Sequence, residues 1–282
     1  MIIDFHTHSF PDAIAARAVD SLAANAHMLP YSDGTTEGLR RSMAAAGIDL
    51  SVLMPVVTKP HQEATINRTA MAINEHTTET GLLSFGGIHP ENENYREILK
   101  NLAAHGVPGI KLHALFQQAP MDDVRYLRII GCASELGLAV LVHAGYDPGF
   151  PGEDLASPAR LHRMIREVRP ERLILAHMGG WCDWEAAEEL FGENVWIDTS
   201  SSITPLRDEH GADVSGKPYT PLAAERFVQM VRAISPDRVL FGSDSPWADQ
   251  AESLKRTRES GLTELELDAV LGGSAAKFLG TE

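Results

Sequence analysis

The sequence has 282 residues, of which 44% are hydrophobic and 22% are charged, as in ordinary globular proteins. Its 39 acidic residues against 24 lysines and arginines give a net charge of −15, which argues against nucleic acid or a membrane surface as a partner, because both need a clustered basic surface. The sequence has only two cysteines, Cys132 and Cys182, so we expect no framework of disulfides. No signal peptide follows Met1, and no apolar run reaches the length of a membrane span. We therefore expect a cytoplasmic protein.

Segments typical of strands alternate with segments typical of helices along the whole chain. Residues 138–142 are continuously apolar, as expected of a parallel strand covered by helices. Residues 122–136 instead repeat apolar side chains at three-residue steps, as one face of a helix does. Such patterns predict strands at residues 1–8, 48–57, 82–89, 109–113, 138–142, 172–177, 194–199 and 239–244, and helices at residues 11–28, 38–47, 62–80, 92–105, 122–136, 157–168, 182–191, 221–234 and 249–279.

This alternation predicts the fold class. Repeated strand–helix units form parallel sheets, and the number of units with the chain length favours a single-domain (β/α)8 TIM barrel over residues 1–282. The first strand is not followed by Gly-x-Gly-x-x-Gly, so a dinucleotide-binding fold has little support. Residues 200–220 are rich in Ser, Pro, Gly and charge, and we interpret them as an active-site loop.

Polar residues recur where the predicted strands end. His6-Thr7-His8 closes the first strand, and residues two apart on a strand point to the same face. Active sites of TIM barrels form at the carboxyl ends of the strands, where imidazoles and carboxylates can bind one metal ion. The residues at these ends are His6, His8, His89, Lys111, His113, His143, His177, Asp198 and Asp244.

Several motifs together resemble a known family. They are Asp-Phe-His-Thr-His at residues 4–8, Gly-Ile-Lys-Leu-His at residues 109–113, His143 after an apolar strand, Ala-His-Met-Gly-Gly at residues 176–180 and Phe-Gly-Ser-Asp-Ser-Pro-Trp at residues 241–247. In order and spacing they resemble the amidohydrolase superfamily, and most closely its amidohydrolase-related branch, which includes aminocarboxymuconate-semialdehyde decarboxylase. Ser274 stands where relatives commonly have Asn, in a segment that we expect to be a structural cap.

The resemblance implies roles for individual residues. His6, His8, His143 and Asp244 would bind a divalent metal ion, and Asp244 would also take part in proton transfer. His177 would be an acid/base or electrostatic group, or a second-metal ligand as in binuclear relatives. Lys111 and His113 are further candidates for a second metal or for substrate, since some relatives bridge two metals with a carbamylated lysine. One metal is favoured.

Other residues are candidates for supporting roles. Arg207 and Lys217 could anchor a substrate carboxylate, and Trp181, Trp247 and His89 could line the pocket. Asp4 and Asp198 are expected to orient an imidazole through a hydrogen bond. The remaining histidines are expected on the surface, and they are His27, His61, His76, His105, His162 and His210.

The expected function is hydrolysis of a small, carboxylate-bearing substrate by a metal-activated water. The expected cofactor is zinc, with manganese, iron or cobalt as alternatives. A second hypothesis is non-oxidative decarboxylation of an unsaturated or aromatic acid by the same residues. A remote third is a metal-binding scaffold without catalysis. A homodimer is a family-level expectation.

Overall fold

The computed structural model describes residues 1–208, 210–211 and 220–281. These residues form two compact units. The first unit consists of Met1–Leu53, Asp147–Pro151 and Asp198–Glu282, and the second of Met54–Tyr146 and Gly152–Ile197. Of the helices in this described part of the chain, none combines the length and the hydropathy that a membrane crossing requires.

The first unit contains both ends of the chain. Its strands are β1 (Ile3–Thr7), β2 (Met28–Leu29), β3 (Leu50–Leu53), β10 (Arg207–Asp208) and β11 (Val239–Leu240). Its helices are α1 (Asp12–Ala26), α2 (Thr36–Ala46), α9 (Ala224–Ile234), α10 (Gln250–Arg258), α11 (Glu264–Asp268) and α12 (Ser274–Leu279), with a 3-10 turn at Pro236–Arg238 and a π-helical turn at Ala269–Gly273.

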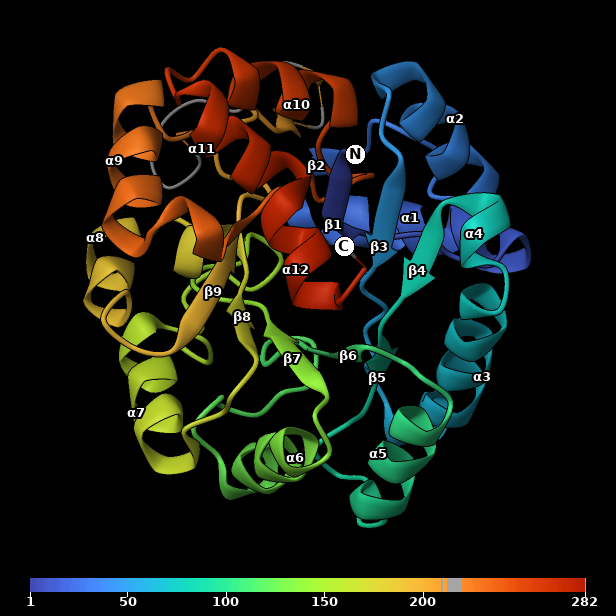
Figure 1. The fold of residues 1–282 in the computed structure, drawn as a ribbon. Helices are drawn as coiled ribbons and strands as arrows, with labels where there is room; N and C mark the ends of the chain where they lie inside the picture. Colours follow the sequence, from blue (N-terminus) through green and yellow to red (C-terminus); the bar gives the residue numbers. More distant parts are fainter. Residues whose placement is uncertain (209, 212–219, 282) are drawn as a thin grey trace. The chain divides into compact units, whose positions relative to one another are not determined.

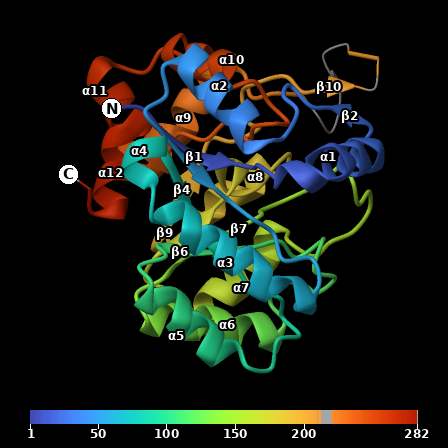
Figure 2. The ribbon, with the colours of Figure 1, turned by 90° about the vertical axis from the view of Figure 1, so that its right-hand side faces the viewer.

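Parallel pairing of β1 with β3 organises this unit. The Thr7 hydroxyl donates to the carbonyl of Val52 (2.9 Å), which ties the end of β1 to β3. The Phe5 N–H donates to the carbonyl of Phe241 (2.7 Å), and the Phe5 ring packs edge-on against Phe278 of α12. The short strands β2 and β10, far apart in sequence, pair antiparallel (Figure 2).

The second unit alternates strands and helices. Its strands are β4 (Leu82–Ser84), β5 (Gly86–Gly87), β6 (Gly109–Leu112), β7 (Ala139–Val142), β8 (Leu173–Leu175) and β9 (Val195–Asp198), whose last residue belongs to the first unit. Its helices are α3 (Glu63–Asn74), α4 (Thr77–Thr80), α5 (Tyr95–Ala104), α6 (Val124–Glu135), α7 (Pro158–Val168) and α8 (Trp184–Ala187), with 3-10 turns at Pro60–Gln62, His177–Gly179 and Glu188–Leu190.

Strands β5 to β9 lie side by side in sequence order and are parallel (Figure 1). Every residue of β6, β7 and β8 is buried, which explains their lack of alternation. Sequential parallel strands joined by helices are the predicted strand–helix units. The pairing therefore agrees with the predicted α/β organisation.

The helix predicted at residues 249–279 divides into α10, α11 and α12. Two other predicted elements are interrupted beside side-chain amides. The helix predicted at residues 62–80 breaks after Asn74, whose side-chain amide bonds the backbone N–H (2.6 Å) and carbonyl (2.9 Å) of Ser84. The strand predicted at residues 82–89 divides into β4 and β5, and Asn67 bonds both backbone groups of Gly87 in the same way. The asparagine side chains thus form backbone hydrogen bonds that a further helical turn or a neighbouring strand would otherwise form. The hydrophobic periodicity of the sequence does not predict such contacts.

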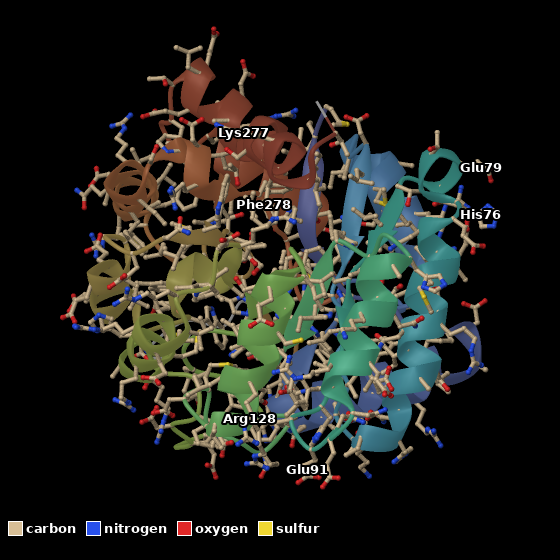
Figure 3. All side chains as sticks on the ribbon, turned by 60° about the horizontal axis from the view of Figure 1, so that its bottom comes forward. His76, Glu79, Glu91, Arg128, Lys277 and Phe278 are labelled. Carbon is tan, nitrogen blue, oxygen red and sulfur yellow. The ribbon has the colours of Figure 1, made fainter. Side chains whose placement is uncertain are left out.

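The histidines predicted on the surface lie there. His76 projects from the surface beside Glu79 (Figure 3), with a 3.3 Å ion-pair distance. His27, His61, His105 and His210 are exposed, and His162 is partly exposed. The candidate site residues have the opposite character, since His6, His89, His113, His143 and His177 are all buried.

Candidate functional site

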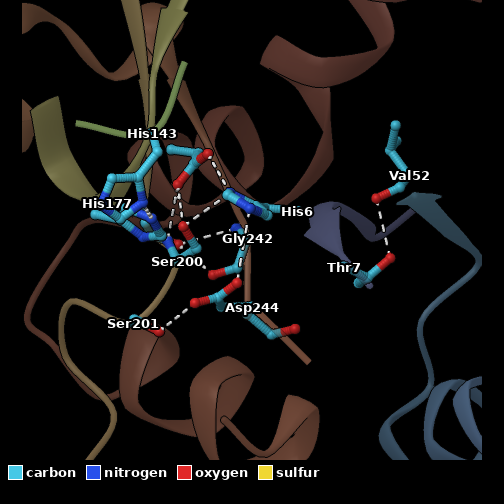
Figure 4. A network of polar contacts seen from close by, with 12 residues as sticks. His6, Thr7, Val52, His143, His177, Ser200, Ser201, Gly242 and Asp244 are labelled. Atoms are coloured by element: carbon cyan, nitrogen blue, oxygen red, sulfur yellow. Dashed lines mark hydrogen bonds and ion pairs between the residues drawn. The ribbon is translucent and has the colours of Figure 1, made fainter. Parts of the chain in front are cut away.

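The first unit brings His6, His8 and Asp244 together. The Asp244 Oδ1 atom lies 3.6 Å from His6 Nε2 (Figure 4). The same oxygen lies 3.2 Å from His8 Nε2. One ligand atom from each residue lies within 4.8 Å of the other two. The His6 side chain is fully buried, whereas that of His8 is 16% exposed, so the group has a protected side and an accessible side. Two imidazole nitrogens and one carboxylate oxygen so placed fit a divalent metal ion.

Asp198 determines which nitrogen of His6 is available. Its Oδ2 lies 2.8 Å from His6 Nδ1, and both side chains are fully buried. A carboxylate accepts, so Nδ1 carries the hydrogen and Nε2 keeps a lone pair that faces Asp244. Carboxylates commonly orient metal-binding histidines in this way. The contact predicted for Asp198 is therefore confirmed.

Ser200 supports this pair. Its hydroxyl donates to Asp198 Oδ1 and lies 3.0 Å from His6 Nδ1, and its backbone N–H donates to the same Asp198 oxygen (3.0 Å). Both carboxylate oxygens of Asp198 thus have partners. Sequence reasoning missed Ser200 and Ser201, although a run of hydroxyl residues directly after a strand-end aspartate was visible at residues 198–202.

Asp244 is held by its backbone and by Ser201. The Ser201 hydroxyl donates to Asp244 Oδ2 (2.7 Å), the oxygen other than the one that faces the histidines. Both residues have left-handed backbones, with φ of 50° at Ser201 and 74° at Asp244. Such conformations cost on the order of 1–3 kcal/mol at non-glycine residues and cluster at functional sites.

Gly242 lets this turn approach β1 closely. A Cβ at Gly242 would lie 2.9 Å from His6 Cβ. The Thr199 hydroxyl bonds both backbone groups of Gly242, at 3.0 Å each. Any larger residue at 242 would push against His6.

Asp4 has a different partner from the one predicted. Its carboxylate accepts from the backbone N–H of His6 (3.2 Å), from Ser243 and from Gln250, so it holds the backbone at His6 rather than an imidazole. Complete burial raises the pKa of Asp4 to about 6, although these hydrogen bonds lower it. The sequence indicated the correct face of β1 but not the partners, which come from residues 243 and 250.

A second cluster, of His113, His143 and His177, lies in the second unit. The His113 and His143 rings stack with centroids 4.2 Å apart, and His177 Nε2 lies 3.0 Å from His143 Nδ1 (Figure 4). The His143 Nε2 atom lies 3.0 Å from the carbonyl of Tyr146. A carbonyl only accepts, so Nε2 of His143 carries the hydrogen and Nδ1 presents the lone pair. His177 Nε2 therefore donates to His143.

His177 does not end a strand as predicted. It begins a 3-10 turn after β8, and its φ is 59°. Trp184 donates from Nε1 to its carbonyl (3.1 Å), and the Trp181 ring lies 6.4 Å from its own ring between centroids. The left-handed backbone redirects the imidazole toward His143.

The other candidate residues differ in how exposed they are to solvent. Lys111 and His113 are buried on and after β6, and Trp181 is 5% exposed. Trp247 is partly exposed, and its N–H donates to the carbonyl of Asp244 (2.9 Å). Arg207 is exposed, with its guanidinium 3.9 Å over the ring of Tyr31.

Two predicted candidates have local structural contacts. His89 Nδ1 accepts from the N–H of Glu91 (3.2 Å), and burial lowers its pKa. The Ser274 hydroxyl donates to the carbonyl of Pro236 (3.0 Å), as expected of a structural cap. Lys217 lies outside the described residues, as does most of residues 209–219.

The two clusters hold all the predicted metal ligands. His6, His8 and Asp244 meet in the first unit, and His143 meets His177 in the second. The joining of His143 to the first three ligands at one ion stays a prediction.

Solved structures share the fold of this chain. An uncharacterized TIM-barrel protein from Bordetella bronchiseptica matches with a TM-score of 0.71 and 17% identity, over 99% of this chain and 98% of that one. The 5-carboxyvanillate decarboxylase from Novosphingobium aromaticivorans was crystallised with manganese and a nitrobenzoic acid. It matches with a TM-score of 0.71 and 13% identity, over 99% of this chain and 97% of that one. A probable 2-pyrone-4,6-dicarboxylic acid hydrolase from Acinetobacter baumannii, crystallised with citric acid, matches with a TM-score of 0.63 and 15% identity, over 99% of each chain.

These likenesses confirm the predicted α/β TIM-barrel fold class. A search of curated proteins found no match. The model of the amidohydrolase family, however, matches residues 3–281, nearly the whole chain. The order of the strand-end motifs had indicated the same relationship. The chain therefore belongs to the amidohydrolase family.

Proposed function

We propose that this chain is a metal-dependent hydrolase of a small, carboxylate-bearing substrate, with His6, His8, His143 and Asp244 as ligands of one divalent ion. The observation that carries the proposal is the approach of Asp244 Oδ1 to both Nε2 atoms, with the His6 lone pair directed by Asp198. His143 is included by family resemblance and by the lone pair on its Nδ1. The proposal requires that both clusters serve the same ion.

The donor groups fit a divalent metal, and we propose zinc. Mixed nitrogen and oxygen ligands suit zinc, while manganese, iron and cobalt accept the same set. The manganese in the Novosphingobium decarboxylase makes manganese the first alternative. A second metal at Lys111, His113 and His177 is the less favoured arrangement, since the motif at residues 109–113 resembles the branch of the family that binds one metal.

The chain's own residues divide the chemistry between them. A divalent ion bound here supplies Lewis acidity, which can lower the pKa of a coordinated water from about 15.7 to about 7. Asp244 accepts the proton of the attacking water and returns it to the leaving group. His177 donates from Nε2 to the oxygen on which negative charge develops, in place of its present donation to His143. Trp181, Trp247 and His89 are proposed to line the substrate pocket.

Non-oxidative decarboxylation is the second candidate function. The structural similarity to 5-carboxyvanillate decarboxylase favours it. In this reaction the bond between the substrate carbon and its carboxylate breaks, carbon dioxide leaves, and the carbon takes up a proton. Arg207 is the proposed carboxylate anchor, and its stacking on Tyr31 holds it in place in the free protein.

The remaining expectations are also proposals. We propose a single domain over residues 1–282, a cytoplasmic location, a homodimer, and a small-molecule substrate as the partner, without nucleic acid or membrane. The high acidic charge supports the absence of polyanionic partners.

The product distinguishes the two reactions. The protein, loaded with zinc or manganese, is incubated with a panel of lactones, amides, and unsaturated and aromatic carboxylic acids, and carbon dioxide and acid release are measured separately. Acid release without carbon dioxide supports the hydrolase, and carbon dioxide release supports the decarboxylase. Stoichiometric metal without any turnover would favour the non-catalytic scaffold. A purified chain that binds no divalent metal would refute all three.

Variants test the assignments. We expect His6→Ala and Asp244→Asn to abolish turnover and to lose metal. We expect His177→Asn to abolish turnover and to keep one metal per chain, because this residue is proposed as a proton donor and not as a ligand. His105→Ala is the matched control, since His105 is an exposed histidine whose ring nitrogen Nδ1 bonds the carbonyl of Asn101 in its own helix (2.8 Å). Loss of metal in His177→Asn would indicate a ligand role instead.

A further inference from the structure

The backbone of Asp244 is held on both sides. Its backbone N–H donates to the carbonyl of His6 (2.8 Å), and its carbonyl accepts from the N–H of Trp247 (2.9 Å). These bonds place Cβ but leave the carboxylate plane undetermined, because the terminal torsion of aspartate is broad and roughly two-fold. A ligand carboxylate in this state could present one oxygen or both to a metal.

The Ser201 hydroxyl constrains the carboxylate plane of Asp244. It donates to Asp244 Oδ2 at 2.7 Å, whereas Oδ1 faces the two histidines. The Ser201 backbone N–H lies 3.4 Å from the carbonyl of Ser243, so Ser201 is tied to the residue before Asp244 as well. Ser201 is 7% exposed, so water competes little for this hydrogen bond.

The backbone conformations point to the same role. Ser201 and Asp244 both have positive φ, at 50° and 74°, although neither is a glycine. A left-handed residue is usually Gly, Asn or Asp, and for serine the conformation is unfavourable. Strained residues persist where the surrounding structure holds them, and here the two strained residues bond each other through their side chains.

We propose that Ser201 is a positioning residue that makes Asp244 a one-oxygen metal ligand. It engages Oδ2 and leaves Oδ1 for the ion. This inference rests on the proposed function, because it requires Asp244 to be a metal ligand. It adds a residue that acts through Asp244 and touches neither the ion nor the substrate.

Two substitutions separate positioning from a structural role. Ser201→Ala removes the hydroxyl and keeps the unfavourable φ, whereas Ser201→Gly removes the hydroxyl and relieves the strain. Ser202→Ala is the matched control, since Ser202 is a buried serine whose hydroxyl donates to the carbonyl of Ser200 (3.0 Å). The measurements are thermal unfolding of the metal-free variants, Co²⁺ affinity by competition with a chromophoric chelator, and the visible spectrum of the Co²⁺ form.

We expect both Ser201 variants to bind Co²⁺ about 10- to 100-fold more weakly than the unaltered chain, the usual effect of removing a hydrogen bond to a metal ligand. Their Co²⁺ spectra should both become weaker as the second Asp244 oxygen joins the coordination, while Ser201→Gly unfolds at a higher temperature than Ser201→Ala. Ser202→Ala should keep affinity and spectrum.

Two outcomes would overturn the inference. If Ser201→Gly keeps full affinity and an unchanged spectrum, or if affinity follows thermal stability across the variants, Ser201 is structural only. If the unaltered chain binds no Co²⁺, the proposed metal site itself fails, and the role of Ser201 fails with it. The first result leaves the proposed function standing, so the two failures are distinguishable.

Discussion

Replacement of Asp198 by asparagine tests how the chain selects the tautomer of His6. Asp198 Oδ1 accepts from the hydroxyl and the N–H of Ser200, and Oδ2 accepts from His6 Nδ1. In Asp198→Asn the single amide oxygen satisfies the two Ser200 donors, so the amide NH₂ faces His6 Nδ1. The imidazole then takes its hydrogen on Nε2, the nitrogen that faces Asp244, and its lone pair no longer points to the metal.

The size of the effect follows from this hydrogen bond. It spans 2.8 Å between fully buried groups, and a hydrogen bond to a charged group contributes about 1.5–3 kcal/mol. Since about 1.4 kcal/mol corresponds to a factor of ten, we expect metal affinity to fall about 10- to 150-fold. Competition with a chromophoric chelator measures the affinity, and circular dichroism verifies that the fold is retained.

Asp49→Asn is the control for this substitution. Asp49 belongs to the same unit, and its carboxylate accepts from the N–H of Ile2 (2.7 Å) at an exposed position away from the ligands. Its metal affinity should not change. Unchanged affinity in a folded Asp198→Asn protein would refute the tautomer argument, and equal losses in both variants would indicate a nonspecific effect of charge.

Three further predictions concern other regions. Burial, together with the charge of Asp183, raises the pKa of the Cys182 thiol to about 12, so iodoacetamide should label it slowly at pH 8 in the native protein and rapidly after unfolding. Hydrogen bonds from Arg232 lower the pKa of Glu266 to about 2. The stabilising effect of these bonds is present above the ordinary pKa of 4.5 and is lost as the pH falls through 2. In Arg232→Ala, an NMR titration should find the pKa of Glu266 closer to 4.5. Tyr126 donates to Gln117 Oε1 (2.8 Å) inside the core, and Tyr126→Phe should cost about 1 kcal/mol of unfolding free energy in urea. Fast native labelling, an unchanged Glu266 titration or unchanged urea stability would contradict the respective prediction.

Local patterns accounted for most of the helices and strands. Apolar runs located β6 to β8, and the three-residue repeat located α6. The pattern failed at residues 62–89, because Asn67 and Asn74 bond backbone groups that lie 20 and 10 residues away. Asparagine is a common surface residue, so its sequence position does not signal these contacts.

The residues of the candidate site were also predictable from the sequence only in part. The strand-end pattern and the motif order made His6, His8, His143, His177 and Asp244 candidates from the sequence alone, because buried strands that end in His or Asp have few structural explanations. The supporting residues were predicted only in part. Asp198 was a candidate among several, and Ser200 and Ser201 were not considered.

The sequence by itself determined the residue types of this protein's candidate metal centre, their order and the family to which the chain belongs. Tertiary structure decided which nitrogen of His6 carries the hydrogen and which oxygen of Asp244 faces the ring. Those choices depend on hydrogen bonds between residues 192 positions apart, His6 and Asp198, and 43 positions apart, Ser201 and Asp244. They also depend on left-handed backbones at Ser201 and Asp244, which no local preference of serine predicts.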